Sequence, residues 1–97
     1  MARTRLTDDE IATALAGLPG WSRYGDAITK RFTFPTFAEA IAFVTRVAPL
    51  ADAMDHHPDL DIRYNRVTCS LSTHDRDGVT ELDVRLASQI EGVGQAE

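Results

Sequence analysis

The 97-residue sequence predicts an α+β fold: a four-stranded antiparallel sheet with three helices on one face, in the order α-β-β-α-β-β-α. Three segments place apolar residues at helical intervals behind a helix-start signal. Two pairs of shorter segments have the pattern of strands joined by a short turn, and the clearer pair is apolar on one face only. Helices should therefore cover one side of the sheet. No linker or repeat interrupts the chain, so residues 1–97 are expected to form one domain.

The first third of the chain predicts a helix and a hairpin. Thr7 and Glu10 have the spacing of a capping box, which begins a helix over about residues 8–18. A turn at Gly25-Asp26 then joins two strands, and the second strand carries Ile28, Phe32 and Phe34 on one face.

A second helix is predicted behind a capping box formed by Thr36 and Glu39. Its apolar stripe consists of Phe37, Ile41, Val44, Val47, Ala48 and Ala51. Pro49 lies inside this stripe, where proline removes one backbone hydrogen bond and clashes with a carbonyl, so a kink or a break is expected there.

A second hairpin is expected after Pro58, with its turn at Asn65-Arg66. This turn pairs Tyr64 with Val67, Ile62 with Cys69 and Leu60 with Leu71, which puts all six side chains on one face.

The last helix is predicted to begin at Thr80, with Asp83 at the capping-box position, and to end near Gly92. Leu82, Leu86 and Ile90 are its inward positions.

Composition excludes several classes of function. The 43% of hydrophobic residues fits one small globular domain. The formal charge of −5 and the isoelectric point near 5.0 argue against a surface that binds nucleic acid. No apolar run approaches the roughly 18 residues of a membrane span, so a cytoplasmic protein without membrane contact is expected. The single cysteine, Cys69, cannot form an internal disulfide and is consistent with a reducing compartment.

Two adjacent histidines precede a proline at the end of the second helix and suggest a functional site. The residue before proline avoids the helical region, so His57 should be extended while His56 still belongs to the last helical turn. Asp52 lies four residues before His56 and could orient its ring, whose protonated form the helix dipole favours. An alternative is that Asp52 and His56 form a surface pair and His57 is an ordinary loop residue.

His74 ends the last strand, and the hairpin should return it to the vicinity of Pro58 and the two histidines. Three imidazoles could also bind metal, but adjacent histidines rarely face one ion, so no metal is expected. A nucleophile made of Cys69 and a histidine is less favoured, because Cys69 falls on the apolar face.

For Asp83, a helix cap is at least as good an explanation as a catalytic role. Trp21 and Tyr64 could flank a flat heterocycle, although Tyr64 also fits the core and Trp21 a partly buried strand position.

These residues follow a recognisable pattern. It reads Asp52, three residues, His56-His57-Pro58, five residues, Tyr64, nine residues, His74, eight residues and Asp83. The pattern resembles the pterin-4a-carbinolamine dehydratase family, as do the segments FTFPTFAEAIAFVTRVA, YNRVTCSLSTH and LASQIE, so the resemblance covers about residues 15–92. Pro49 departs from the family, which usually continues this helix.

The resemblance implies a dimer or tetramer that dehydrates 4a-hydroxytetrahydrobiopterin to quinonoid dihydrobiopterin, a step that recycles the cofactor of aromatic amino-acid hydroxylases. It implies that His56 and His74 are the acid and base, that His57 contacts the substrate, and that Asp52 and Asp83 support the pocket. Histidine, with an ordinary pKa of about 6.5, can donate or accept a proton near neutral pH. No redox change occurs, so no cofactor is expected. A non-catalytic dimerisation partner of a transcription factor, or a paralogue acting on another carbinolamine, remains an alternative.

Overall fold

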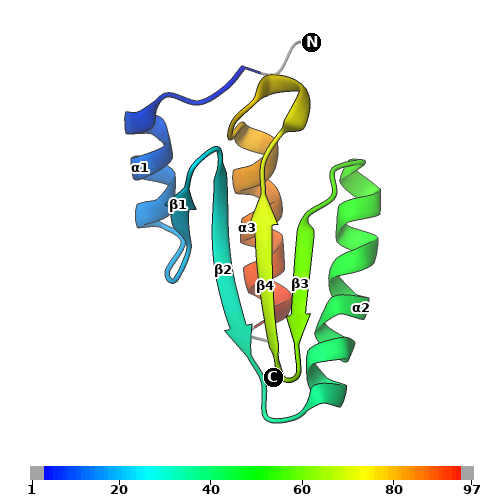
Figure 1. Cartoon of the computed structure of the whole chain (residues 1–97). Helices are drawn as coiled ribbons and strands as arrows, with labels where there is room; N and C mark the ends of the chain where they lie inside the picture. Colours follow the sequence, from blue (N-terminus) through cyan, green and yellow to red (C-terminus); the bar gives the residue numbers. More distant parts are fainter. Residues whose placement is uncertain (1–3, 95–97) are drawn as a thin grey trace.

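The computed structural model, which describes residues 4–94, contains three α-helices and four strands in the predicted order (Figure 1). The elements are α1 (Asp8–Ala16), β1 (Ser22–Tyr24), β2 (Ala27–Thr33), α2 (Phe37–Met54), β3 (Asp59–Arg63), β4 (Arg66–Leu71), the 3-10 helix η1 (His74–Arg76) and α3 (Glu81–Gly94). The strands form one antiparallel sheet in the order β1-β2-β4-β3, so β2 and β4 are central. The predicted fold class is confirmed.

The sheet has one buried and one polar face. Along the buried face, Val67 of β4 pairs with Phe32 of β2, and Leu71 pairs with Ile28. These side chains share a core with Phe43 of α2 and with Leu86 and Ile90 of α3, and α3 lies directly behind the sheet (Figure 1). On the opposite face, Thr68 pairs with Arg31 and Asp61.

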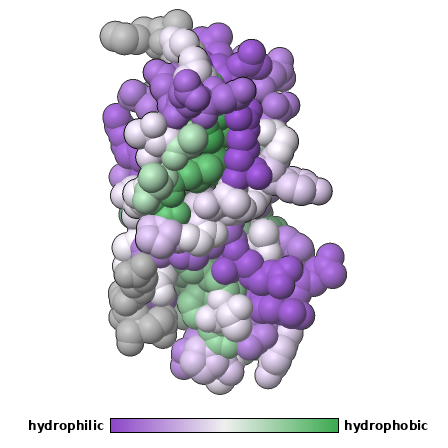
Figure 2. All heavy atoms as spheres, turned by 90° about the vertical axis from the view of Figure 1, so that its left-hand side faces the viewer, coloured by the Kyte–Doolittle hydropathy of each residue, from purple (hydrophilic) through white to green (hydrophobic). Residues whose placement is uncertain are grey.

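The first helix and hairpin form largely as predicted. Thr7 Oγ1 accepts a hydrogen bond of 3.1 Å from the Glu10 amide, and Glu10 Oε1 accepts one of 2.8 Å from the Thr7 amide, which completes the capping box. The helix ends at Ala16, two residues earlier than expected. The hairpin turns at Gly25, whose φ of 62° is readily adopted by glycine. Seen from the α1 side, the surface has apolar areas bordered by hydrophilic side chains (Figure 2).

Helix α2 begins at its predicted cap, because Thr36 Oγ1 accepts a hydrogen bond from the Glu39 amide. Its buried face is rotated from the predicted stripe and consists of Ala40, Phe43, Val47 and Ala51. Phe37 and Ala48, which were expected to face the core, are exposed.

The helix is continuous through Pro49, so the expected break does not occur. Proline at this position removes the amide that would have bonded the Thr45 carbonyl. Thr45 and Pro49 are both exposed, so water can hydrate that carbonyl.

The second hairpin has a different register from the predicted one. Arg63 pairs with Arg66 and Ile62 with Val67, so the turn residues are Tyr64 and Asn65. Tyr64 takes the positive φ of 53°, and the residue is 69% exposed, so the expectation that Tyr64 lies in the core is wrong. The shift is by two residues, which preserves the face on which each remaining apolar side chain lies.

Helix α3 begins where expected but extends past Gly92 to Gly94, so the predicted stop at Gly92 is wrong. Leu86 and Ile90 are buried, as is Asp83, whereas Leu82 is only half-buried. Within residues 4–94, no helix is both long and apolar enough to cross a membrane.

Candidate active site

The end of α2 positions the adjacent histidines. Asp55 adopts the left-handed conformation (φ 49°, ψ 44°), and its amide donates to the Asp52 carbonyl at 3.1 Å. The His56 amide donates to the Ala51 carbonyl, also at 3.1 Å. Together these two bonds form a Schellman motif, which satisfies carbonyls at the helix end and reverses the chain direction. His56 and His57 therefore both lie beyond the helix.

His56 projects inward. Its Nε2 lies 2.5 Å from Oδ1 of Asp83, near the start of α3. The His56 side chain is only 10% exposed and that of Asp83 is fully buried. A buried carboxylate needs compensating hydrogen bonds, and this imidazole supplies one of them.

The other Asp83 oxygen also has partners. Oδ2 accepts hydrogen bonds of 2.9 Å from the Thr80 amide and from the Thr73 hydroxyl. The hydroxyl groups of Thr73 and Thr80 are themselves 2.8 Å apart. Asp83 therefore caps α3, as predicted, and also binds His56.

His57 projects outward. Its Nε2 lies 2.9 Å from Oδ1 of Asp52, and both side chains are well exposed. The sequence predicted Asp52 as the partner of His56, and this pairing is wrong because Asp55 reverses the chain between the two residues. Pro58 is half-buried and, with His57, lines a groove of about 180 Å³ against α2.

His74 begins η1, and its side chain is exposed. It directly follows Thr73, whose hydroxyl is part of the Asp83 network. Asp59 pairs with Ser70, so His57 and His74 both lie just beyond the same end of the β3–β4 hairpin. No residue within 4–94 hydrogen bonds to the His74 ring.

The two aromatic residues that could flank a flat heterocycle, Tyr64 and Trp21, lie elsewhere. Tyr64 is in the turn at the far end of β3, roughly 20 Å from Pro58 at the rise of an extended strand. Trp21 is 5% exposed and donates from Nε1 to Glu91 Oε1 at 2.9 Å. Glu91 is eight residues beyond Asp83 on α3, about 12 Å along the helix axis. The fold therefore brings neither aromatic ring to the histidines of this chain.

Cys69 is fully buried, and burial raises the pKa of its thiol to about 12. Such a thiol is protonated at neutral pH and cannot act as a nucleophile. Among the described residues, no group of three or more His, Cys, Asp or Glu side chains is arranged to hold a metal ion.

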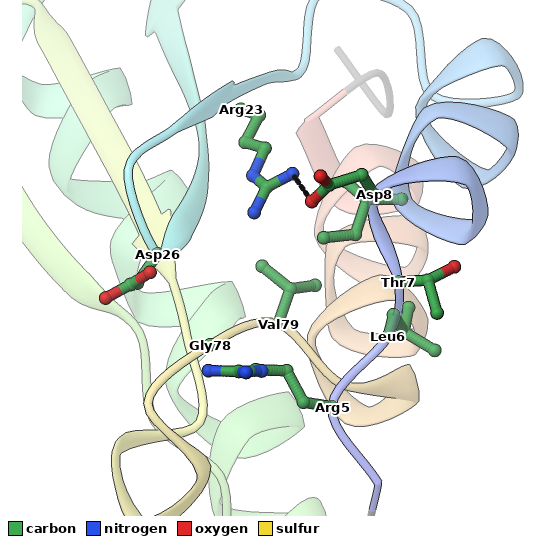
Figure 3. Close-up of a pocket in the computed structure, with 9 residues that line it drawn as sticks. Arg5, Leu6, Thr7, Asp8, Arg23, Asp26, Gly78 and Val79 are labelled. Carbon is green, nitrogen blue, oxygen red and sulfur yellow. Dashed lines mark hydrogen bonds and ion pairs between the residues drawn. The ribbon is translucent and has the colours of Figure 1, made fainter.

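A cavity of about 410 Å³ lies apart from these residues, between the start of α1 and the turn before β2 (Figure 3). Arg23 and Asp8 form an ion pair of 2.6 Å across it, and this hydrogen bond, with the charge of Arg23, lowers the pKa of Asp8. None of the predicted site residues lines this cavity.

Sequence reasoning missed the role of Thr73. A signal was present: Val67, Cys69 and Leu71 alternate toward the core, and Thr73 continues that alternation with a polar side chain. A hydroxyl at an inward position requires a buried partner, which is Asp83.

The arrangement joins three elements around one carboxylate: His56 after α2, Thr73 after β4, and the start of α3. Among the described residues, none hydrogen bonds to the second ring nitrogen of His56, Nδ1. An imidazole anchored to a carboxylate through one nitrogen can exchange a proton through the other.

Comparison with known proteins supports one family. Residues 4–93 match the family model described as pterin 4 alpha carbinolamine dehydratase. A protein of Roseiflexus sp. (strain RS-1), named provisionally as a pterin-4-alpha-carbinolamine dehydratase, is 53% identical over 90 residues, covering 93% of this chain and 97% of the relative. A Mycobacteroides abscessus protein with the same provisional name is 51% identical over 86 residues, covering 89% and 92%.

Two solved structures have a similar fold. A Brucella melitensis protein described as a transcriptional coactivator/pterin dehydratase superposes with a TM-score of 0.91 at 40% identity, over 94% of this chain and 99% of that one. A pterin dehydratase-like protein described as a RuBisCO assembly factor superposes with a TM-score of 0.64 over 79% of this chain and 89% of that one. Its 19% identity supports a shared fold only.

Proposed function

This chain belongs to the pterin 4 alpha carbinolamine dehydratase family, and we propose that it dehydrates 4a-hydroxytetrahydrobiopterin to quinonoid dihydrobiopterin. The observation that carries the proposal is the buried His56–Asp83 pair, which lies within residues 4–93, the part of the chain that matches the family model. The reaction breaks the bond between carbon and hydroxyl, releases water, and forms a double bond to a ring nitrogen. It requires one proton donated to the hydroxyl and one removed from the ring, with no electron transfer to a cofactor.

We assign these two proton transfers to His56 and His74. Asp83 fixes the ring of His56, whereas His74 is exposed at the same end of the sheet, where it is accessible to a bound substrate. General acid–base catalysis by positioned side chains typically contributes about 10²- to 10⁴-fold, which suits a reaction that already proceeds slowly in water.

His57 is assigned to substrate contact, with Asp52 holding its ring. We expect His57→Ala to raise KM while nearly preserving kcat, because the ring contributes binding in the ground state and transition state alike. An equal fall in kcat and kcat/KM would instead place His57 among the proton-transfer groups.

The function is tested with purified protein and freshly generated 4a-hydroxytetrahydrobiopterin. We expect acceleration of dehydration without added metal, because imidazoles supply the chemistry. Activity that a chelator abolishes and zinc restores would refute the metal-free mechanism. Addition of the chain to an aromatic amino-acid hydroxylase assay should raise the steady-state rate if the chain recycles that enzyme's cofactor.

We also propose that the chain self-associates, at least as a dimer. Helix α2 and edge strand β3 carry apolar side chains that this chain leaves uncovered, with Phe37 50% and Ile62 40% exposed. Large exposed apolar areas mark interaction surfaces. Sedimentation at micromolar concentration should show a species above the 10.7 kDa chain mass, and Ile62→Lys should dissociate it. A wild-type monomer would contradict this proposal.

A second candidate function is non-catalytic: a dimerisation partner or co-regulator protein. The description of the Brucella protein as a transcriptional coactivator favours it, as does the apolar surface on α2 and β3. Binding to a transcription factor by a chain that lacks dehydratase activity would support this candidate against the enzyme.

A further inference from the structure

The buried hydroxyl groups of Thr73 and Thr80 have no role in the pattern that identifies the family site. Thr73 is 6% exposed and Thr80 is 1% exposed, and both lie against the carboxylate that holds His56. A hydroxyl group has one hydrogen to donate and two lone pairs to accept with. This inventory fixes the direction of every hydrogen bond in the network.

The Thr73 hydroxyl donates its hydrogen to Oδ2 of Asp83 at 2.9 Å. It therefore has none left for Thr80, and the 2.8 Å bond between the hydroxyls must be donated by Thr80. Thr80 Oγ1 in turn accepts the Leu82 amide at 3.2 Å. The hydrogens thus point in one direction, from Leu82 through both hydroxyls to Asp83.

Oδ2 of Asp83 also accepts the Thr80 amide, so two donors occupy it and a carboxyl proton has no place there. The remaining oxygen, Oδ1, faces Nε2 of His56 at 2.5 Å. Two unprotonated atoms facing each other over this distance would repel, so one of them carries a hydrogen. That atom is Nε2, because an imidazole ordinarily binds a proton more strongly than a carboxylate does. The neutral ring then has its lone pair on Nδ1.

We propose that Thr73 and Thr80 are positioning residues that hold Asp83 so that His56 is protonated at Nε2 and exchanges protons with substrate through Nδ1. The catalytic part of this inference rests on the dehydratase function proposed above, whereas the tautomer does not. Nδ1 is the working atom in both directions: it accepts a proton when the ring is neutral and donates one when the ring is charged.

The tautomer is measured directly on the wild-type protein by ¹⁵N nuclear magnetic resonance, at a pH where His56 is neutral. We expect a pyrrole-type signal for Nε2 and a pyridine-type signal for Nδ1. The reverse assignment would overturn the inference without bearing on whether the chain is a dehydratase. Because this measurement needs no variant, it establishes the tautomer of His56 even if a substitution in the network prevents folding.

The positioning role is tested with Thr73→Val, which removes the hydroxyl at nearly constant shape, and Thr73→Ser, which keeps it. In Thr73→Val, loss of one hydrogen bond to the carboxylate should lower kcat about tenfold with little change in KM. Thr73→Ser, which keeps this hydrogen bond, should have nearly the wild-type kcat. Thr68→Val is the matched control: Thr68 lies on the polar face of β4, the strand that precedes Thr73, and its replacement should leave kcat and the His56 signals unchanged.

A folded Thr73→Val protein with wild-type kcat would overturn the positioning role. Equal losses in the valine and serine variants would also overturn it, because the serine variant keeps the hydroxyl, and the loss would then follow from altered packing at this position. An inactive wild-type protein that has the expected tautomer would refute the dehydratase function and leave the hydrogen-bond assignment intact.

Discussion

Replacement of Asp83 by alanine should destabilise the whole fold. The substitution leaves three buried donors without an acceptor: His56 Nε2–H, the Thr73 hydroxyl and the Thr80 amide. Each such group costs about 1–3 kcal/mol, so three of them together cost at least about 3 kcal/mol. We therefore expect a loss of about 4 kcal/mol, which is a large part of the roughly 5–15 kcal/mol by which small proteins are stable.

The assay is urea unfolding followed by far-ultraviolet circular dichroism. With a denaturant slope of about 2 kcal/mol per molar urea, a loss of 4 kcal/mol lowers the midpoint by about 2 M. Asp59→Ala is the control, because Asp59 is exposed on β3, and its effect should stay within about 0.5 kcal/mol. If Asp83→Ala costs less than about 1 kcal/mol, the network around this carboxylate does not exist as described.

Two further predictions concern residues outside the histidine site. Burial raises the pKa of Cys69 to about 12, so only about one thiol in 10⁴ is ionised at pH 8. Cys69 of the native protein should therefore resist thiol reagents that label it rapidly after unfolding in guanidinium. Equal labelling rates for the native and unfolded protein would disprove the burial of Cys69. Trp21→Phe removes the hydrogen bond to Glu91 and should lower stability by about 1 kcal/mol in the same urea assay. Its kcat/KM should stay at the wild-type value; a tenfold loss would mean that Trp21 contacts the substrate.

The fold could be predicted because its signals are local. The capping box of Thr7 and Glu10 and the cap at Thr36 depend only on nearby residues, and both form as the spacing predicts. The break at Pro49 was predicted from the same local rules, but the cost of proline depends on exposure. At an exposed position, water can hydrate the carbonyl that lost its partner.

The register of the second hairpin could not be predicted, because a distant contact helps to set it. The Asn65 side chain donates to the Phe34 carbonyl at 2.7 Å, and the Phe34 amide donates to the Asn65 carbonyl at 2.9 Å. These bonds hold Asn65 inside the turn and leave Tyr64 in the left-handed conformation. Local turn preferences disfavour a tyrosine there, which is why the sequence favoured Asn65-Arg66.

The sequence predicted that the histidines lie at one end of the sheet, but it did not predict their hydrogen-bond partners. Helical spacing predicted that Asp52 pairs with His56. In the structure, the left-handed conformation of Asp55 turns the chain so that Asp52 hydrogen bonds to His57 instead. His56 instead binds Asp83, which is 27 residues later in the chain. Such a contact depends on how α2 and α3 pack, and no short-range pattern contains that information.

The central claim, that histidines of this chain catalyse dehydration of a 4a-carbinolamine, is tested most directly by the His56→Ala/His74→Ala double variant. Stopped-flow measurement of kcat should show a loss on the order of 10²-fold or more relative to wild type, because both proton-transfer groups are removed. The double variant is needed because either histidine could partly replace the other in a single variant. A double variant that is folded by circular dichroism and retains near wild-type kcat would contradict the claim, and the histidines would then serve binding or structure.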